Sequence, residues 1–189
     1  SLTAFLPILP IISDMNNILD GTAYFSLSAW VKPAALANWK SILTKYSSAT
    51  NNISLQLNAS DDQCGNDDFN IAVMNGGSAQ GCTNSNLVST GNWYHLVAVY
   101  DGTQGNNENR LKLYVNGIQR SLTFTGTIPA TTGSNAATVK IGFENDVSTY
   151  WNGQIDDVKI FNYPLTATQV RNEYNQGSAI RFGPITGTP

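Results

Sequence analysis

The sequence has few charged residues. Charged side chains make up 12% of its 189 residues, well below the quarter that is typical of globular domains. The ten Lys and Arg residues are scattered, and the formal net charge is −3. Binding to nucleic acid needs clustered cations that displace counterions. A nucleic-acid partner is therefore not expected.

The sequence also lacks a long apolar run. Its most apolar stretch, residues 1–13, is far shorter than the roughly 20 residues of a membrane-spanning helix, and Pro7 and Pro10 would break a helix. This stretch lacks both an initiator Met and the basic start of a signal peptide. We expect no transmembrane segment. Residues 1–23 should form an apolar extended segment of a secreted or surface-displayed chain whose leader was removed.

Only two cysteines are present, Cys64 and Cys82, and both lie in polar stretches rich in Gly and Asn. Their spacing fits no CxxC zinc pattern. Cysteines that pack as small hydrophobic residues tend to lie in apolar runs instead. We predict a disulfide that closes a surface loop, which implies an oxidising, extracellular compartment.

Groups suited to catalysis are scarce as well. The single histidine, His95, lies in an apolar strand with no nucleophile or acid at a recognisable spacing, which is typical of a structural residue. Asp156 and Asp157 are adjacent within a predicted strand. Because neighbours in a strand point to opposite faces, they should not form the paired carboxylates of a glycosidase. We predict that the chain is not an enzyme.

Alternating apolar and polar residues dominate the rest of the sequence. Short segments rich in β-branched and aromatic residues, separated by turn signals, predict strands at 24–32, 41–47, 53–58, 69–75, 93–101, 111–117, 138–143 and 153–162. Asn116-Gly117 predicts a two-residue hairpin turn before 118–124. The expected fold is all-β, an antiparallel sandwich of two sheets in a jelly roll.

One short C-terminal helix is expected between Pro164 and Gly177. Thr166 and Gln169 have the spacing of a capping box, and Leu165 and Val170 that of a hydrophobic staple. Gly177 suits the left-handed stop. Because Ala167, Val170 and Tyr174 share one face, the helix should pack against a sheet.

Four motifs occur in order: FSLSAWVKP, GNWYHLVAVYDG, LKLYVNG and GQIDDVKIFNYPLTATQV, at 25–33, 91–102, 111–117 and 153–170. This series, spread over residues 20–177, resembles the laminin G-like domains of the concanavalin A-like lectin/glucanase superfamily, which are also related to pentraxins. The resemblance implies a jelly roll at 24–177. It also implies a mostly non-catalytic module that binds glycan or protein, often through calcium.

The chain departs from this pattern at its ends. Relatives carry an N-terminal strand with a segment like ALxFDG, whereas here the tail at 178–189 contains the similar Ala179–Pro184. Either the tail pairs within its own sheet, as in a permuted domain, or it fills a gap in a neighbouring subunit. An exchange through the N-terminal segment is a further alternative. Such exchange would assemble filaments.

The resemblance also indicates candidate metal ligands. It points to Asp156 as a calcium ligand, and Asp146 in the neighbouring loop would supply a second carboxylate. The alternative for Asp156 is a structural carboxylate. A second acidic cluster surrounds Cys64, at 61–62 and 67–68. Some glucanases of this superfamily have a Glu-x-Asp-x-x-Glu strand motif, and the nearest match is Glu144-Asn145-Asp146, with Thr149 in place of the third acid.

Aromatic side chains at predicted loops are candidates for stacking on sugar rings. Tyr150 and Trp151 are the first choice, with closure of the end of the sandwich as their alternative role, and Trp39 is a further candidate. We therefore expect an adhesion or recognition module at the cell surface that binds a glycan or protein, with calcium optional. The alternative is a structural subunit of a surface filament, pilus or layer that assembles by strand exchange.

Overall fold

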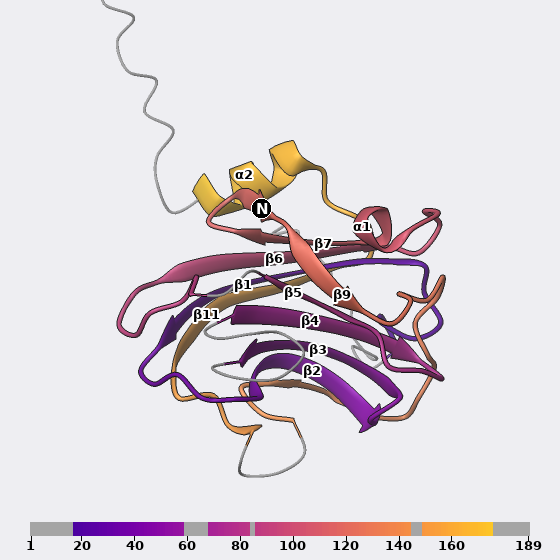
Figure 1. The fold of residues 1–189 in the computed structure, drawn as a ribbon, viewed down its shortest axis with the longest axis horizontal. Helices are drawn as coiled ribbons and strands as arrows, with labels where there is room; N and C mark the ends of the chain where they lie inside the picture. Colours follow the sequence, from indigo (N-terminus) through magenta and orange to yellow (C-terminus); the bar gives the residue numbers. More distant parts are fainter. Residues whose placement is uncertain (1–16, 59–67, 84–85, 145–148, 176–189) are drawn as a thin grey trace, which may run out of the picture.

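The computed structural model of the chain describes residues 17–58, 68–83, 86–144 and 149–175. Two antiparallel sheets pack face to face (Figure 1). This confirms the predicted jelly-roll sandwich. The five-stranded sheet has the order β11-β1-β6-β7-β8, with β1 Tyr24–Pro33, β6 Tyr94–Asp101, β7 Leu111–Val115, β8 Ile118–Arg120 and β11 Gly153–Phe161.

The second sheet has six strands in the order β10-β2-β3-β4-β5-β9. Its strands are β2 Lys40–Ser48, β3 Asn51–Asn58, β4 Asp68–Asn75, β5 Gln80–Thr83, β9 Leu122–Thr125 and β10 Val139–Ile141. The predicted turn at Asn116-Gly117 joins β7 to β8. After Arg120 the chain passes to the other sheet, because β9 pairs with β5.

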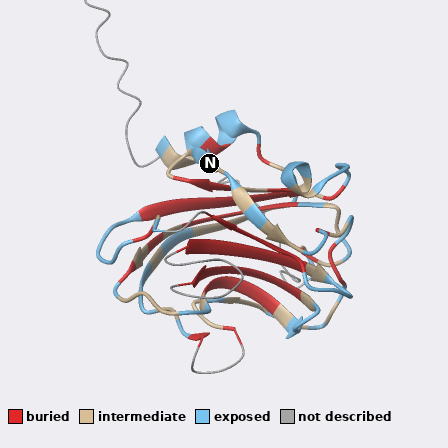
Figure 2. Ribbon diagram, viewed as in Figure 1, coloured by how far each residue is buried: buried red, intermediate tan, exposed pale blue. Residues whose placement is uncertain are grey.

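The core lies between the two sheets and follows from strand alternation. On β6, Tyr94, Leu96, Ala98 and Tyr100 belong to the main core. The intervening Val97 and Val99 pack in a second, smaller core on the opposite face. Figure 2 shows the buried residues concentrated along the strands of both sheets.

Helix α2, Ala167–Asn175, covers the outer face of the five-stranded sheet (Figure 1). The predicted capping box is present: Thr166 N donates to Gln169 Oε1 at 2.8 Å, and Gln169 N donates to Thr166 Oγ1 at 3.3 Å. Leu165 and Val170 are buried together in the second core. Neither described helix is long and apolar enough to cross a membrane.

Two elements, α1 and β5, were not predicted from sequence, and a third, β9, pairs differently from the prediction. Helix α1, Asn107–Arg110, lies between β6 and β7, and Asn106 caps it by accepting a hydrogen bond from Asn109 N at 3.1 Å. The predicted hairpin arm 118–124 is divided between two strands: β8 pairs with β7, whereas β9 pairs with β5 in the other sheet. Strand β5 has only four residues, too few for alternation to stand out from the surrounding polar sequence.

Candidate functional site

The outer face of the six-stranded sheet carries polar side chains although most of them are buried. Strand β3 explains the arrangement: Ile53 and Leu55 point into the main core, so Asn52, Ser54 and Gln56 point the other way. Each of these three is no more than 5% exposed. A buried row of amides and hydroxyls needs partners, which the neighbouring strands supply.

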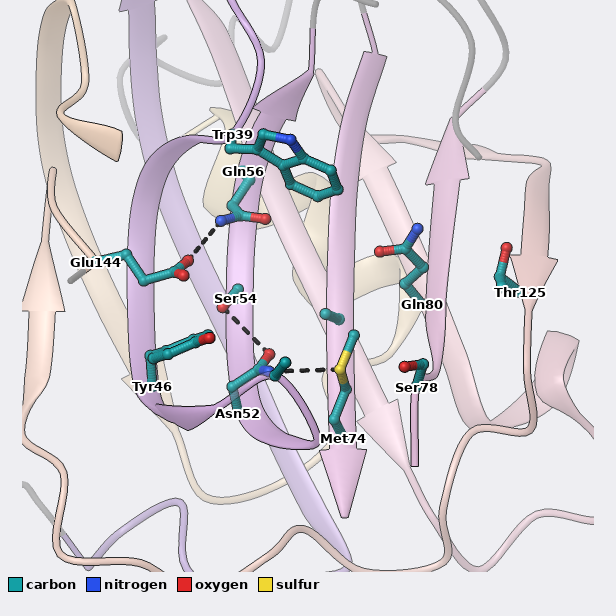
Figure 3. A pocket seen from close by; sticks show the side chains of 12 residues that line it. Trp39, Tyr46, Asn52, Ser54, Gln56, Met74, Ser78, Gln80, Thr125 and Glu144 are labelled. Atoms are coloured by element: carbon teal, nitrogen blue, oxygen red, sulfur yellow. Dashed lines mark hydrogen bonds between the residues drawn. The ribbon is translucent and has the colours of Figure 1, made fainter. Parts of the chain in front are cut away.

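A pocket of about 210 Å³ opens on this face, and we call it the outer pocket (Figure 3). Strands β2, β3, β4, β5 and β9 contribute side chains to it. The connections next to β2, β5 and β10 contribute the others. The lining residues are Trp39, Tyr46, Ala49, Asn52, Ser54, Gln56, Ala72, Met74, Ser78, Gln80, Thr125 and Glu144.

Hydrogen bonds within the outer pocket hold its polar side chains in place. Gln56 Nε2 donates to Glu144 Oε2 at 2.6 Å. Ser54 Oγ donates to Asn52 Oδ1 at 3.3 Å, and Asn52 Nδ2 donates to the main-chain oxygen of Ser48 at 2.9 Å. Side chains that are locked by neighbours lose little conformational freedom when a ligand binds. The pocket is therefore preorganised.

Trp39 stands at the end of this pocket in an unusual backbone conformation. Its φ angle is 58°, in the left-handed region that is strained for a bulky residue. The buried Asn58 stabilises it, because Trp39 N donates to Asn58 Oδ1 at 3.0 Å. The indole remains 41% exposed. In Figure 3, Trp39 and Tyr46 lie on either side of the Gln56–Glu144 pair.

The two aromatic residues that sequence reasoning put first lie elsewhere. Tyr150 is half exposed and stacks on Phe143, with 4.7 Å between ring centroids. Trp151 packs against the main core, and its Nε1 donates to the main-chain oxygen of Gln154 at 3.2 Å. Neither lines the outer pocket. Of the three predicted ligand-binding residues, only Trp39 does so.

Asp156 and Asp157 do not point to opposite faces of the sheet, and that prediction is wrong. The register of β11 against β1 shifts at this point, and Asp157 has a φ angle of 48°, as in a β-bulge. Ile155 and Val158 both pack against the main core although they are three positions apart. The extra residue between them turns both carboxylates away from the core.

Both aspartates have local partners. Asp157 N donates to Asp156 Oδ1 at 2.8 Å, and the Asp157 carboxylate pairs with Lys159 at 3.1 Å. No group of three or more His, Cys, Asp or Glu suited to a metal was found in the described ranges. Asp146 lies outside them, so calcium at Asp156 stays a prediction.

Cys82 does not lie in a surface loop. It lies on β5, is 1% exposed, and accepts a weak hydrogen bond from Asn70 Nδ2 at 3.6 Å. Its predicted partner Cys64 is outside the described residues, so the Cys64–Cys82 pairing stays a prediction. In the nearby acidic cluster, only Asp68 is described, and it is fully buried on β4.

Glu144, Gln56, Asn52 and Ser54 were not identified as a site from sequence. The available signal was the alternation in ISLQLN, which put Ser54 and Gln56 on the polar face of a strand. Glu144 follows β10, a strand distant in sequence, and only the pairing of β10 with β2 brings it beside β3. Glu144 was noted only as the nearest match to a glucanase motif.

Similar folds occur in several solved structures. Domain 4 of the extracellular arabinanase from Geobacillus stearothermophilus, in complex with arabinotriose, is 24% identical, with a TM-score of 0.58 over 82% of this chain and 68% of that chain. The CBM40 of a Ruminococcus gnavus sialidase, bound to α2,3-sialyllactose, is 11% identical, with a TM-score of 0.60 over 82% and 84%. A pentraxin from Limulus polyphemus is 19% identical, with a TM-score of 0.52 over 81% and 70%.

A search of curated proteins found no significant match. The family model of the concanavalin A-like lectin/glucanases superfamily, in contrast, matches residues 11–171. This range includes all the strands of both sheets, the outer pocket and the start of α2. The chain belongs to the concanavalin A-like lectin/glucanase superfamily.

Proposed function

We propose that the chain is a non-catalytic glycan-binding module and that the outer pocket is its binding site. The observation that carries this proposal is the combination in one pocket of an exposed, strained Trp39 with a preorganised set of amides and hydroxyls. The apolar face of a sugar ring packs on an aromatic ring. The hydroxyl groups of a sugar both donate and accept hydrogen bonds, so they can pair with the amide and hydroxyl side chains of the pocket.

The charges in the pocket support binding rather than hydrolysis. Glycosidases use two carboxylates that flank the scissile bond. Among the described residues that line the outer pocket, Glu144 alone carries a carboxylate. His95, the other candidate for acid–base chemistry, lies on the five-stranded sheet and does not line this pocket.

The relatives support the same reading. The arabinanase domain was solved with arabinotriose and the sialidase module with sialyllactose. We propose that this module acts outside the cell or at its surface, as the predicted disulfide implies. A protein ligand and filament assembly by strand exchange stay predictions. The terminal segments invoked for assembly lie largely outside the described residues.

Replacing Trp39 tests the proposal directly. Trp39→Ala should weaken binding to a glycan-array hit by at least about tenfold, because aromatic anchors contribute most of the binding energy at such sites. Trp93→Ala is the matched control: Trp93 is 40% exposed but does not line the outer pocket. Calorimetry measures both affinities, and circular dichroism checks folding. Equal binding by the two folded variants would refute the proposed site.

A further inference from the structure

Among the residues that the structure describes, the lining of the outer pocket contains a single acidic side chain and no basic one. Of the twelve described lining residues, Glu144 is the acidic one, and it is 8% exposed. Its carboxylate accepts a hydrogen bond from Gln56 Nε2 at 2.6 Å, which points it toward the amides and hydroxyls of the pocket (Figure 3). A buried carboxylate accepts hydrogen bonds and donates none.

Lys140 and Lys45 are two described lysines on the strands beside the outer pocket, and both have other partners. Lys140 Nζ donates to the main-chain oxygen of Glu144 at 2.7 Å and lies 4.7 Å from the centroid of the Phe143 ring. Lys45 is buried, and its Nζ lies 3.3 Å from Asp20. Neither lines the outer pocket, and no other described Lys or Arg does so. A ligand anion would therefore meet the Glu144 carboxyl and no cation among the described lining residues.

We propose that the outer pocket selects a neutral sugar ring, rejects sugars that carry a carboxylate or sulfate, and owes this selectivity to Glu144. This inference rests on the proposed function. A neutral sugar hydroxyl donates to the Glu144 carboxylate, and such charge-assisted hydrogen bonds are stronger than neutral ones. An acidic sugar places a second negative charge where little water screens it, and like charges at close range disfavour binding.

The size of the pocket indicates how much of a glycan it holds. Its volume of about 210 Å³ is below the roughly 300–1,000 Å³ of sites for drug-sized ligands. A space of this size suits one sugar ring, with the rest of a chain outside. A neutral monosaccharide should therefore compete with a longer glycan that ends in the same ring.

The test uses the whole chain on an array of neutral oligosaccharides and their sialylated, uronic-acid and sulfated counterparts. A neutral hit and its acidic counterpart are then compared by calorimetry. The wild-type chain should bind the neutral glycan at least about tenfold more tightly. Glu144→Gln keeps the shape and removes the charge, so it should reduce this preference about tenfold. Glu108→Gln removes an exposed carboxylate outside the pocket and should leave the preference unchanged.

The outcomes separate this inference from the proposed function. If acidic glycans bind as tightly as neutral ones, and Trp39→Ala abolishes both, the selectivity is refuted and the binding site stands. An unchanged preference in folded Glu144→Gln also refutes the selectivity. If Glu144→Gln does not fold, the selectivity is tested by the salt dependence of wild-type binding. Salt screens charge repulsion, so the affinity for acidic glycans should rise with salt concentration and that for neutral glycans should not. An affinity for acidic glycans that does not rise would refute the selectivity. The absence of any Trp39-dependent glycan binding would refute both.

Discussion

At the scale of single residues, His95 is a buried titratable group that faces helix α2. Its side chain is 1% exposed, and its Nε2 lies 3.0 Å from Ser28 Oγ. The rings of Trp30 and Tyr174 lie 5.0 and 5.8 Å from the imidazole, centroid to centroid. Burial lowers the pKa of His95 from 6.5 to about 4, and the nearby negative charge of Glu173 only partly opposes this.

This lowered pKa predicts a loss of stability in mild acid. Between pH 6.5 and pH 4 the unfolded chain binds a proton that the folded chain does not, so the free energy of unfolding falls as pH falls through this range. The loss should reach roughly 2 kcal/mol at pH 5 and roughly 3 kcal/mol at pH 4. Denaturant unfolding at pH 7 and pH 5 measures it, and His95→Gln should reduce the difference.

Because His95 is the only histidine, its ring protons can be followed by NMR without ambiguity. If the ring protons of His95 titrate with a midpoint near pH 6.5, the predicted lowering of the His95 pKa is wrong. Other charges face the same region: Lys159 disfavours the protonated imidazole, whereas Asp157 and Glu173 favour it. Burial opposes the charge of Lys159, but its hydrogen bonds to Glu173 and Asp157 outweigh burial and raise the pKa of Lys159.

At the scale of elements, helix α2 depends on both local and tertiary contacts. Its capping box was predictable, because Thr166 and Gln169 are three residues apart. Its position over the five-stranded sheet comes from packing: Val170 is fully buried in the second core, and Tyr174 stacks on Trp30 at 5.7 Å. Lys159 on β11 adds an ion pair with Glu173 at 2.8 Å.

Val170→Ala should therefore destabilise the protein by about 2 kcal/mol, through lost burial and the cavity that remains. Thr168→Ala changes an exposed side chain on the same helix and serves as the control, with an expected change within about 0.5 kcal/mol. Chemical denaturation measures both. Equal stabilities of the two variants would mean that α2 does not contribute to the cooperative fold.

Strand β11 shows where reasoning from sequence failed. Alternation predicted that Asp156 and Asp157 lie on opposite faces of the sheet. An added residue at a bulge, however, moves every later side chain of the strand to the face opposite the one that alternation predicts. The bulge is not encoded by a turn signal such as Gly or Pro at these positions. It appears only when the register of β11 against β1 is known.

At the scale of the whole molecule, the six-stranded sheet depends on pairings between distant segments. Strand β5 joins β4 to β9, which lies about 40 residues further along the chain. Cys82 is buried at the centre of this arrangement. The predicted disulfide to Cys64 would tie β5 to a segment that precedes β4.

Replacing both cysteines by serine should lower the stability of the protein by roughly 3 kcal/mol, since a disulfide that closes a loop of about 18 residues restricts the unfolded chain by that amount. Thermal unfolding of the oxidised wild type, the reduced wild type and the double variant measures the loss. Reduction should lower the wild-type midpoint and leave that of the double variant unchanged. If reduction has no effect on the wild type, the predicted disulfide is wrong.

The sequence by itself determined the fold class, most strands, helix α2 with its cap, and Trp39 as one aromatic candidate. These features depend on local periodicity, turn chemistry and spacing, which a short window of sequence contains. Only the tertiary structure decided that Glu144 meets Gln56, that Trp39 faces the same pocket, and that Tyr150 and Trp151 do not. Those relations depend on strand order and register between distant segments, which local patterns do not specify.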